Sequence, residues 1–266
     1  MFPGGRESMA RPGQSLLVIC HPSQELRVFG WMSEAQPDVC VLTDGSGSKG
    51  RPRLEFCRLV LKEAKARPGL FFGQFTDIEL YRRLVTHDHG FFITLAETLA
   101  CHLEKSRVVR VVADNAEGFN PGQDVCRLVV DTAVQLATRR SGRQIENFGV
   151  TISGDPGLES ANSLRVCLSA ENLERKLSLA LAYSGLEEEM AWILAKFGRE
   201  AFAVEILNQV KQGLAITHRD PVYEAYGTSR VGAGTYGTVI RYADHMAPLL
   251  WALRVHLQGP TMRRVA

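Results

Sequence analysis

The feature that most constrains the fold is an alternation of short apolar runs with segments of helical periodicity. Each apolar run is bounded by polar residues, which is typical of strands covered on both faces. The clearest runs are SLLVIC at 15–20, DVCVL at 38–42 and VVRVVA at 108–113. Helical spacing is found between and after them, at 25–35, 54–66, 78–85, 91–105 and 125–138. Strands that alternate with helices predict an α/β fold.

The remainder of the chain continues this pattern less regularly. A strand is expected where Leu164, Val166 and Leu168 alternate, and a helix behind it carries Leu173, Leu177 and Leu181 on one face. We expect an irregular loop at 139–162, a strand at 201–207 and a closing helix at 235–257, with the Gly-x-Gly at 232–234 in the loop before it. The whole predicts one domain, 1–266, with a Rossmann-like parallel sheet and helices on both faces. Residues 1–14 form a flexible lead, and 198–266 a less regular extension.

Charge and hydropathy exclude several classes of protein. The formal net charge is only +2, and basic residues are interspersed with acidic ones, so nucleic acid is not an expected partner. The apolar runs are far too short to cross a bilayer, so no membrane association is expected. No signal-peptide pattern precedes the first strand. Six cysteines without a C-x-x-C pair indicate buried, reduced thiols, and we expect a cytoplasmic protein.

Polar residues follow three of the expected strands at their carboxyl ends. These segments are HPSQE at 21–25, Thr43-Asp44-Gly45, and DNAEGFNPGQD at 114–124. In an open parallel sheet, ligands bind beyond the carboxyl ends of the strands, so the three segments predict one site. His21 is expected in a concave pocket there. The alternative is that the Asp, Asn and Gly residues only cap helices and form turns.

The order of these segments resembles the PIG-L/LmbE family of zinc-dependent de-N-acetylases. That family has HPDDE after the first strand, T-D/N-G after the second, an Arg near a Glu at the next helix, an HPDH loop and a late helix. This chain has HPSQE, LTDG, RPRLE at 51–55, GFNPGQD at 118–124 and KLSLALAYS at 176–184. The resemblance spans about residues 15–184. It implies a Rossmann-like fold and hydrolysis of an N-acyl group on an amino sugar, with zinc as cofactor.

The resemblance also implies a role for individual residues. In the family the first His, the second Asp and the last His of these motifs hold zinc, the first Asp is the general base and the other His assists the oxyanion. Matching positions give a metal set of His21, Gln24 and Gln123, with Asp124 beside it, and catalytic candidates His21, Ser23, Asp44 and Asn120. The substrate-binding candidates are Arg51, Arg53 and Tyr183.

The exchanges at these positions are unfavourable for zinc chemistry. A glutamine amide offers a neutral and weak ligand, and a serine hydroxyl at position 23 cannot replace a carboxylate base. A conventional zinc site would need a substitute ligand, for which the candidates are Glu25, Asp44, Asp124, His87 and His89. The two latter histidines are otherwise expected in a loop or on the surface.

Three functional hypotheses follow. The first is a divergent amide hydrolase acting on a sugar-containing small molecule, with His21 and an acidic neighbour in the site. The second is a catalytically inactive binding module that uses the same cleft. The third is a nucleotide-dependent transferase, which the absence of G-x-G-x-x-G after the first strand disfavours. Four tyrosines could line a sugar site or simply pack the C-terminal helix: Tyr223, Tyr226, Tyr236 and Tyr242.

Overall fold

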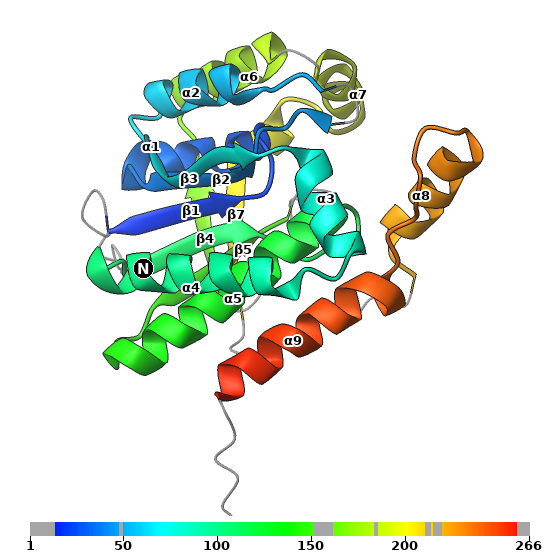
Figure 1. Ribbon diagram of the computed structural model, residues 1–266. Helices are drawn as coiled ribbons and strands as arrows, with labels where there is room; N and C mark the ends of the chain where they lie inside the picture. The colour runs from blue at the N-terminus through cyan, green and yellow to red at the C-terminus, as the bar shows by residue number, and fades with distance from the viewer. Residues whose placement is uncertain are drawn as a thin grey trace, which may run out of the picture.

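The computed structural model describes residues 14–47, 50–151, 162–183, 186–210, 214 and 220–259. Within these residues the centre is a seven-stranded sheet in the order β3-β2-β1-β4-β5-β7-β6 (Figure 1). The strands are β1 (Ser15–Ile19), β2 (Asp38–Thr43), β3 (Arg67–Phe75), β4 (Arg110–Asp114), β5 (Glu146–Val150), β6 (Ser163–Cys167) and β7 (Val204–Gln209). The α/β class predicted from the sequence is confirmed.

The sheet is mixed, so the expectation of a wholly parallel sheet is wrong at one side. Strands β3, β2, β1, β4 and β5 run parallel to one another. Strand β7 pairs antiparallel with β5 and with β6, which forms the edge. After β6 the chain passes through two helices and returns as β7, which inserts between β5 and β6 in the opposite direction. The sequence did not predict this, because a hydrophobic pattern does not show in which direction a strand runs.

Helices cover both faces of the sheet, as expected (Figure 1). On one face lie α4 (His89–Lys105), α5 (Pro121–Ser141) and α9 (Ala247–Gln258), which pack on alternate residues of the central strands, such as Leu16 and Val18. On the other face lie η1 (Gln24–Val28), α1 (Phe29–Ala35), α2 (Leu54–Glu63), α6 (Ala170–Ala182) and α7 (Glu187–Phe197). They pack on the intervening residues, such as Leu17 and Ile19. Because successive strand residues face opposite sides, one apolar run serves both layers.

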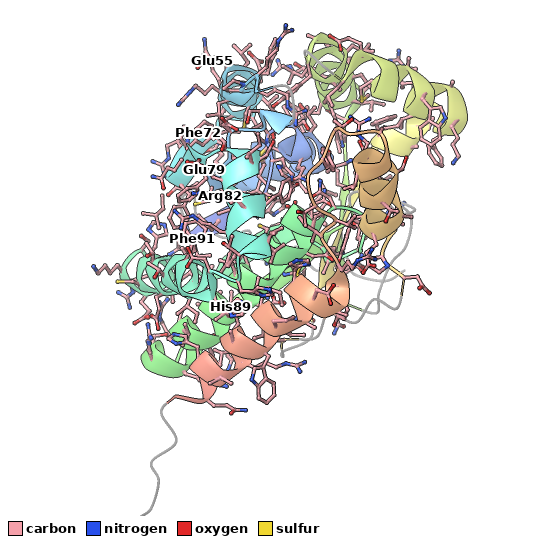
Figure 2. All side chains as sticks on the ribbon, turned by 45° about the vertical axis from the view of Figure 1, so that its right-hand side comes forward. Glu55, Phe72, Glu79, Arg82, His89 and Phe91 are labelled. Carbon is pink, nitrogen blue, oxygen red and sulfur yellow. The ribbon has the colours of Figure 1, made fainter. Side chains whose placement is uncertain are left out.

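The remaining helical elements lie toward the ends of the strands. They are α3 (Asp77–Val85), η3 (Glu200–Phe202), α8 (Val222–Gly232) and η4 (Tyr242–Met246). Helix α3 begins with a capping box, in which the Thr76 hydroxyl accepts from the Glu79 N–H and the Glu79 carboxylate accepts from the Thr76 N–H. Figure 2 shows Glu79 and Arg82 along this helix. Among the described residues, no helix is long and apolar enough to cross a membrane.

Two strands lie where the sequence predicts none. Strand β3 lies between the helices expected at 54–66 and 78–85, where Arg67-Pro68-Gly69 reads only as the end of a helix, and β5 lies inside the expected loop at 139–162. Proline is tolerated in β3 because this strand forms the edge of the sheet, next to β2 alone. In β5, the sequence ENFGV carries too few apolar residues to stand out as a strand. The part of that loop at 152–161 lies outside the described residues, as do Ser184 and nearly all of the lead.

Smaller expectations also need correction. Leu181 is 51% exposed, so it does not share the buried face of α6 with Leu173 and Leu177. Cys101 and Cys167 are exposed, whereas the four remaining cysteines are buried. The closing helix, expected at 235–257, begins only at Ala247, after the π-helical turn η4. Pro248 lies in its first turn, and proline favours the start of a helix because the first N–H groups of a helix have no partner within it. The strand expected at 201–207 is present as β7 but begins only at Val204, because Glu200–Phe202 form the short helix η3.

Candidate functional site

A histidine after β1 is enclosed by segments from four parts of the chain. His21 follows β1 directly, Thr43 ends β2, Asp77 begins α3 and Asn120 caps α5. The carboxyl ends of parallel strands share one edge of the sheet, which brings the first two together. Figure 1 shows α3 on the side to which the β1 arrow points. His21 is only 8% exposed, so the ring is held in a largely dry setting.

One ring nitrogen of His21 contacts a carboxylate. Its Nδ1 lies 2.9 Å from Asp77 Oδ1 and 2.9 Å from Thr43 Oγ1. An ionised carboxylate can only accept a hydrogen bond, so the Nδ1 proton points at this pair and, in the neutral ring, Nε2 carries the lone pair. Thr43 in turn donates its hydroxyl to the Cys20 carbonyl at 3.0 Å. The ring orientation and tautomer are therefore fixed by buried partners.

Asp77 is held in its ionised form. Burial by itself would raise the pKa of this carboxyl, but the hydrogen bond and charge of His21 lower it, together with a hydrogen bond from the Gly47 N–H, to about 2. Hydrogen bonds to the charged form of an acid always act in this direction. The carboxylate thus remains an acceptor for His21 at any ordinary pH.

The second ring nitrogen faces a polar cluster. His21 Nε2 lies 3.4 Å from Asn120 Oδ1 and 3.5 Å from the Tyr81 hydroxyl. Asn120 Oδ1 also accepts from the Tyr81 hydroxyl at 3.1 Å and from the Gly122 N–H at 2.8 Å. Because Asn120 Oδ1 is an acceptor, it suits a protonated Nε2. Burial, more than any neighbouring charge, raises the pKa of Tyr81, so its phenol remains a donor.

The close approach of helix α5 to the ring gives a steric prediction. A Cβ atom at Gly122 would lie 2.8 Å from Cys20 Sγ and 2.9 Å from His21 Nε2. Gly122→Ala should therefore cost about 1–3 kcal/mol of unfolding free energy through overpacking and displace the imidazole. The matched control is Gly90→Ala, also the second residue of a helix, where the nearest atom is 3.8 Å away. Denaturant unfolding should show a neutral or slightly stabilising change there, and equal effects at both positions would contradict the packing.

The positions that match the family's zinc ligands do not form a zinc site here. Gln24 turns back, and its Oε1 accepts the His21 backbone N–H at 2.9 Å. Gln123 is buried, and its Oε1 has no hydrogen-bond partner among the described residues. Within the same residues, no three His, Cys, Asp or Glu side chains are grouped to hold a metal ion. Zinc requires about four ligands from imidazole, thiolate or carboxylate, so this donor set does not fit it.

Two acids near these positions are buried. Asp124 Oδ1 accepts from the Gly118 N–H at 3.2 Å and so closes its own loop. Asp114 accepts from the Cys20 N–H at 2.7 Å. Burial raises the pKa of each to about 7. Both carboxyl groups therefore support the loops around His21, and both ionise near neutral pH.

The other candidates from the sequence lie in the segment between β2 and α2 and, in the case of Tyr183, at the end of α6. Asp44 Oδ1 accepts from the Ser46 N–H at 2.9 Å, which is a turn contact. Arg53 donates to the Gly45 carbonyl at 2.9 Å, and Arg51 is exposed. Tyr183 is buried, and its hydroxyl lies 3.4 Å from the Arg53 carbonyl. These contacts hold the loop in place, and substrate binding by Arg51, Arg53 and Tyr183 remains a prediction.

The remaining side chains of the HPSQE motif shape the turn rather than reach His21. Ser23 has a left-handed backbone, with φ of 93°, and its N–H donates to Glu25 Oε2 at 2.8 Å. Glu25 is fully buried. The histidines of the α3–α4 turn, His87 and His89, contact each other at 5.6 Å between ring centroids, and His87 stacks on His245. No hydrogen bond among the described residues joins either to His21.

Glu25 gives a prediction for stability against pH. Burial raises its pKa from 4.5 to about 7. Between these values the unfolded chain releases a proton that the folded chain keeps, so rising pH favours unfolding and the loss is complete above about 7. Glu25→Gln should therefore stabilise the protein at pH 8 by on the order of 3 kcal/mol, and little at pH 4. Chemical denaturation at both pH values measures this, with exposed Glu55→Gln as control; a pH-independent difference would contradict it.

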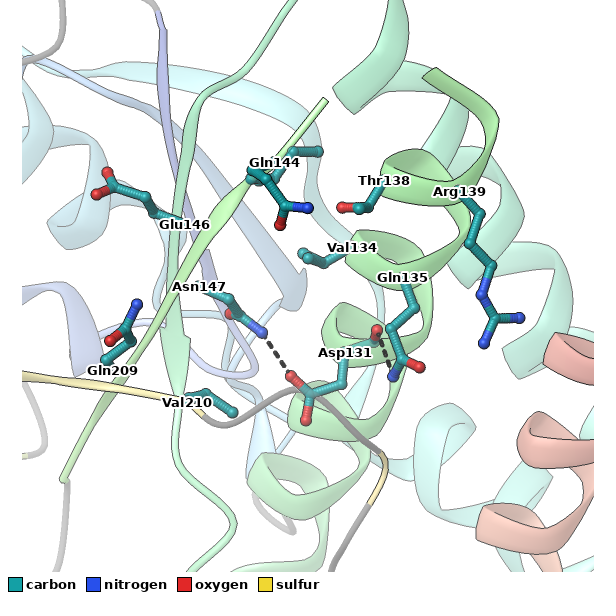
Figure 3. Close-up of a pocket in the computed structure, with 11 residues that line it drawn as sticks. Asp131, Val134, Gln135, Thr138, Arg139, Gln144, Glu146, Asn147, Gln209 and Val210 are labelled. Atoms are coloured by element: carbon teal, nitrogen blue, oxygen red, sulfur yellow. Dashed lines mark hydrogen bonds between the residues drawn. The ribbon is translucent and has the colours of Figure 1, made fainter. Parts of the chain in front are cut away.

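A separate pocket lies at the opposite ends of the strands. It has a volume of about 250 Å³ and lies between α5 and the amino end of β5 (Figure 3). Its two acids are already paired, Asp131 with Arg127 at 2.9 Å and Glu146 with Arg110 at 2.8 Å. Ligands of such sheets bind beyond the carboxyl ends, so we place the candidate site at His21 and not here.

Two residues of the site were missed by sequence reasoning. Asp77 and Tyr81 both come from the first turns of α3, which follows the unpredicted strand β3. The signal that could have found Asp77 is the T-x-x-E capping box at 76–79, which marks a helix start directly after an apolar run. An acid at such a start lies at the strand end, where the other candidates are.

Comparison with known proteins shows likeness in fold. No protein-family model and no curated protein matches the sequence. Among solved structures, the A40926 pseudoaglycone deacetylase Dbv21 superposes with a TM-score of 0.53 at 16% identity, covering 77% of this chain and 99% of that one. A deacetylase of the teicoplanin biosynthesis pathway gives 0.52 at 13% identity, and the zinc-inhibited form of teicoplanin deacetylase Orf2 gives 0.51 at 13%, each covering 75% of this chain and 100% of that one. The chain therefore has the fold of these deacetylases, which is the fold that the PIG-L/LmbE resemblance implies.

Proposed function

We propose that this chain is a divergent PIG-L/LmbE-like amide hydrolase that removes an N-acyl group from a sugar-containing small molecule. The observation that carries the proposal is the pairing of His21 with Asp77 at the carboxyl end of the sheet. A buried carboxylate that orients an imidazole is the arrangement of a general base, and its Nε2 faces polar groups rather than the core. The fold shared with glycopeptide deacetylases supports the substrate class.

The reaction can be written with the residues of this chain. His21 Nε2 takes a proton from water while the water oxygen bonds to the acyl carbon, which gives a tetrahedral oxyanion. Asp77 stabilises the imidazolium through Nδ1–H, and Asn120 Oδ1 accepts from Nε2–H. The same proton then passes to the amide nitrogen as the C–N bond breaks. The products are a carboxylic acid and a free amino sugar.

The developing negative charge has a favourable environment. Helix α5 is 21 residues long, and its first turn lies against the His21 ring through Gly122. The amino end of a helix carries a partial positive charge, which favours an anion nearby. Tyr81, whose hydroxyl lies 3.5 Å from Nε2, becomes a second donor at this position when its hydrogen turns from Asn120 Oδ1 to the oxyanion. These groups are the oxyanion-stabilising elements of the proposal.

The test uses N-acetylglucosamine as the probe. The unmodified protein should release acetate, and His21→Gln should abolish the release while leaving the fold intact by circular dichroism. His102→Gln, a change to a partly buried histidine in the last turn of α4, is the matched control and should retain full activity. Release by His21→Gln at the rate of the unmodified protein would overturn the role of this residue.

A second candidate function is ligand binding without turnover. It is favoured by one observation, that the zinc positions hold Gln24 and Gln123, whose side chains are neutral. In this case isothermal calorimetry would detect N-acetylglucosamine binding that depends on His21, while no acetate appears. The same two assays therefore separate the hydrolase from the binding module.

A further inference from the structure

An arginine on α8 lies between two tyrosine rings. The guanidinium of Arg230 lies 6.0 Å from the ring centroid of Tyr226 and 5.6 Å from that of Tyr236. The two rings are 6.4 Å apart and inclined at 72°. The three side chains form a cluster, called here the Arg230 cluster, in which the guanidinium is held in place.

The Arg230 cluster has a cation but no acid. Within the described residues, Arg230 forms no ion pair with a carboxylate, and its buried Nε has no hydrogen-bond partner. Glu224, the acid one and a half turns earlier on α8, is occupied by Arg241 and by the Tyr242 N–H. Arginine prefers planar, two-point contact with carboxylate or phosphate, so an unpaired and immobilised guanidinium suits a bound anion.

The cluster belongs to the same end of the sheet as His21. The Tyr223 N–H, at the start of α8, donates to the Gly118 carbonyl at 3.3 Å, and Gly118 lies two residues before Asn120. Figure 1 shows α3 and α8 on the side of the sheet to which β1 points. Tyr236 is near enough to Tyr81 to contribute to its raised pKa, after burial and other neighbours. Tyr81 in turn contacts His21.

Exposed aromatic rings are present on α8 and on the loop that carries Asn120. Tyr226 is 56% exposed and Phe119, on the loop that carries Asn120, is 52% exposed. Aromatic rings offer flat apolar faces for the C–H faces of a pyranose. A neutral sugar alone would leave the guanidinium without a partner, whereas a sugar that carries an anionic oxygen group would satisfy both features.

We propose that the Arg230 cluster is a subsite for a phosphate group attached to the amino sugar, with Arg230 as the anion ligand and Tyr226 and Tyr236 as the stacking walls. This inference rests on the proposed function, because it takes the sugar to be bound at His21. It adds the substrate class, an N-acylated sugar phosphate. A carboxylate-bearing sugar has related chemistry and is separated from it by the test.

The test compares four probes on the full chain by calorimetry: N-acetylglucosamine, N-acetylglucosamine 1-phosphate, N-acetylmuramic acid and inorganic phosphate. The phosphorylated sugar should bind about 10-fold more tightly than the neutral one, as a charge-assisted hydrogen bond permits. Arg230→Gln should remove this gain and leave the neutral sugar unaffected, and Arg230→Lys should restore part of it. The matched control is Arg58→Gln. Arg58 lies on α2 with its guanidinium over the Phe72 ring of β3, and its loss should leave the affinity for all four probes unchanged.

The outcomes separate this proposal from the function on which it rests. Equal affinity for neutral and phosphorylated sugar, or a phosphate gain that survives in Arg230→Gln, would overturn the subsite and leave the function standing. Tighter binding of N-acetylmuramic acid than of the phosphate would replace phosphate by carboxylate and overturn the stated class. Arg230-dependent binding of inorganic phosphate without either sugar would support the subsite and contradict the function. Binding of none of the four would overturn both.

Discussion

Asp77→Asn is expected to lower the rate of amide hydrolysis by about 10³-fold, within the range that general-base catalysis contributes. The ionised carboxylate accepts the Nδ1 proton of His21 at 2.9 Å. An asparagine presents either an acceptor or a donor, and its NH₂ would turn Nδ1 into the acceptor and place the proton on Nε2. The base then points its lone pair away from the substrate. Acetate release from N-acetylglucosamine measures the loss.

The tautomer of His21 gives a second readout that needs no substrate. Nitrogen NMR of the imidazole should show the proton on Nδ1 in the unmodified protein and a shift toward Nε2 in Asp77→Asn. Asp38→Asn is the control. Asp38 lies at the start of β2, pairs with Arg67 at the start of β3 and has no contact with His21. An unchanged tautomer together with an unchanged rate would remove Asp77 from the site.

Introducing the family's residues should raise the zinc affinity of the chain well above that of the natural protein. The change is Ser23→Asp, Gln24→Asp, Asn120→His and Gln123→His together, which with His21 supplies a His/Asp/His set and a carboxylate base. Zinc affinity follows ligand type and geometry, so binding should tighten by at least about 10³-fold. Asn120 caps α5 through the Gly122 N–H, and its loss costs on the order of 1 kcal/mol of unfolding free energy.

The control for this experiment keeps the ligand positions unchanged. A double variant, Ser23→Asp with Asn120→His, leaves Gln24 and Gln123 in place and should gain little zinc affinity. Calorimetry and elemental analysis on all three proteins give the result. No gain in the quadruple variant would show that the motifs are wrongly aligned or that the backbone around them differs from that of the zinc enzymes.

The sequence predicted the parts of the fold that depend on continuous hydrophobic burial. Strand β1 is buried on both faces, and its run of Leu, Val and Ile identifies it without further context. Strand β5 is flanked by β4 and by the antiparallel β7, and ENFGV obtains its place from these partners rather than from its own composition. In the same way β3 contains Pro68 and Gly69, which indicate a stop in isolation. Neighbours overrode local preference at both strands.

The site was predicted in part for the same reason. His21 follows a strong strand signal and Asn120 precedes a strong helix signal, and the structure brings His21 Nε2 and Asn120 Oδ1 to 3.4 Å. Asp77 depends on β3 and could not be placed while that strand was unknown. The side-chain directions of Gln24 and Asp44 are set by hydrogen bonds to nearby backbone N–H groups, which motif spacing does not specify.

The central claim is that the His21–Asp77 pair acts as the base in a deacetylase fold whose zinc positions have changed. Acetate release by the unmodified protein, measured with and without a strong zinc chelator, tests this claim most directly. N-acetylglucosamine and its 1-phosphate are the substrates, and Asp77→Asn is run beside the natural chain. We predict release that the chelator does not affect and that Asp77→Asn reduces about 10³-fold. Release that the chelator abolishes and added zinc restores would contradict this account, as would the absence of any release.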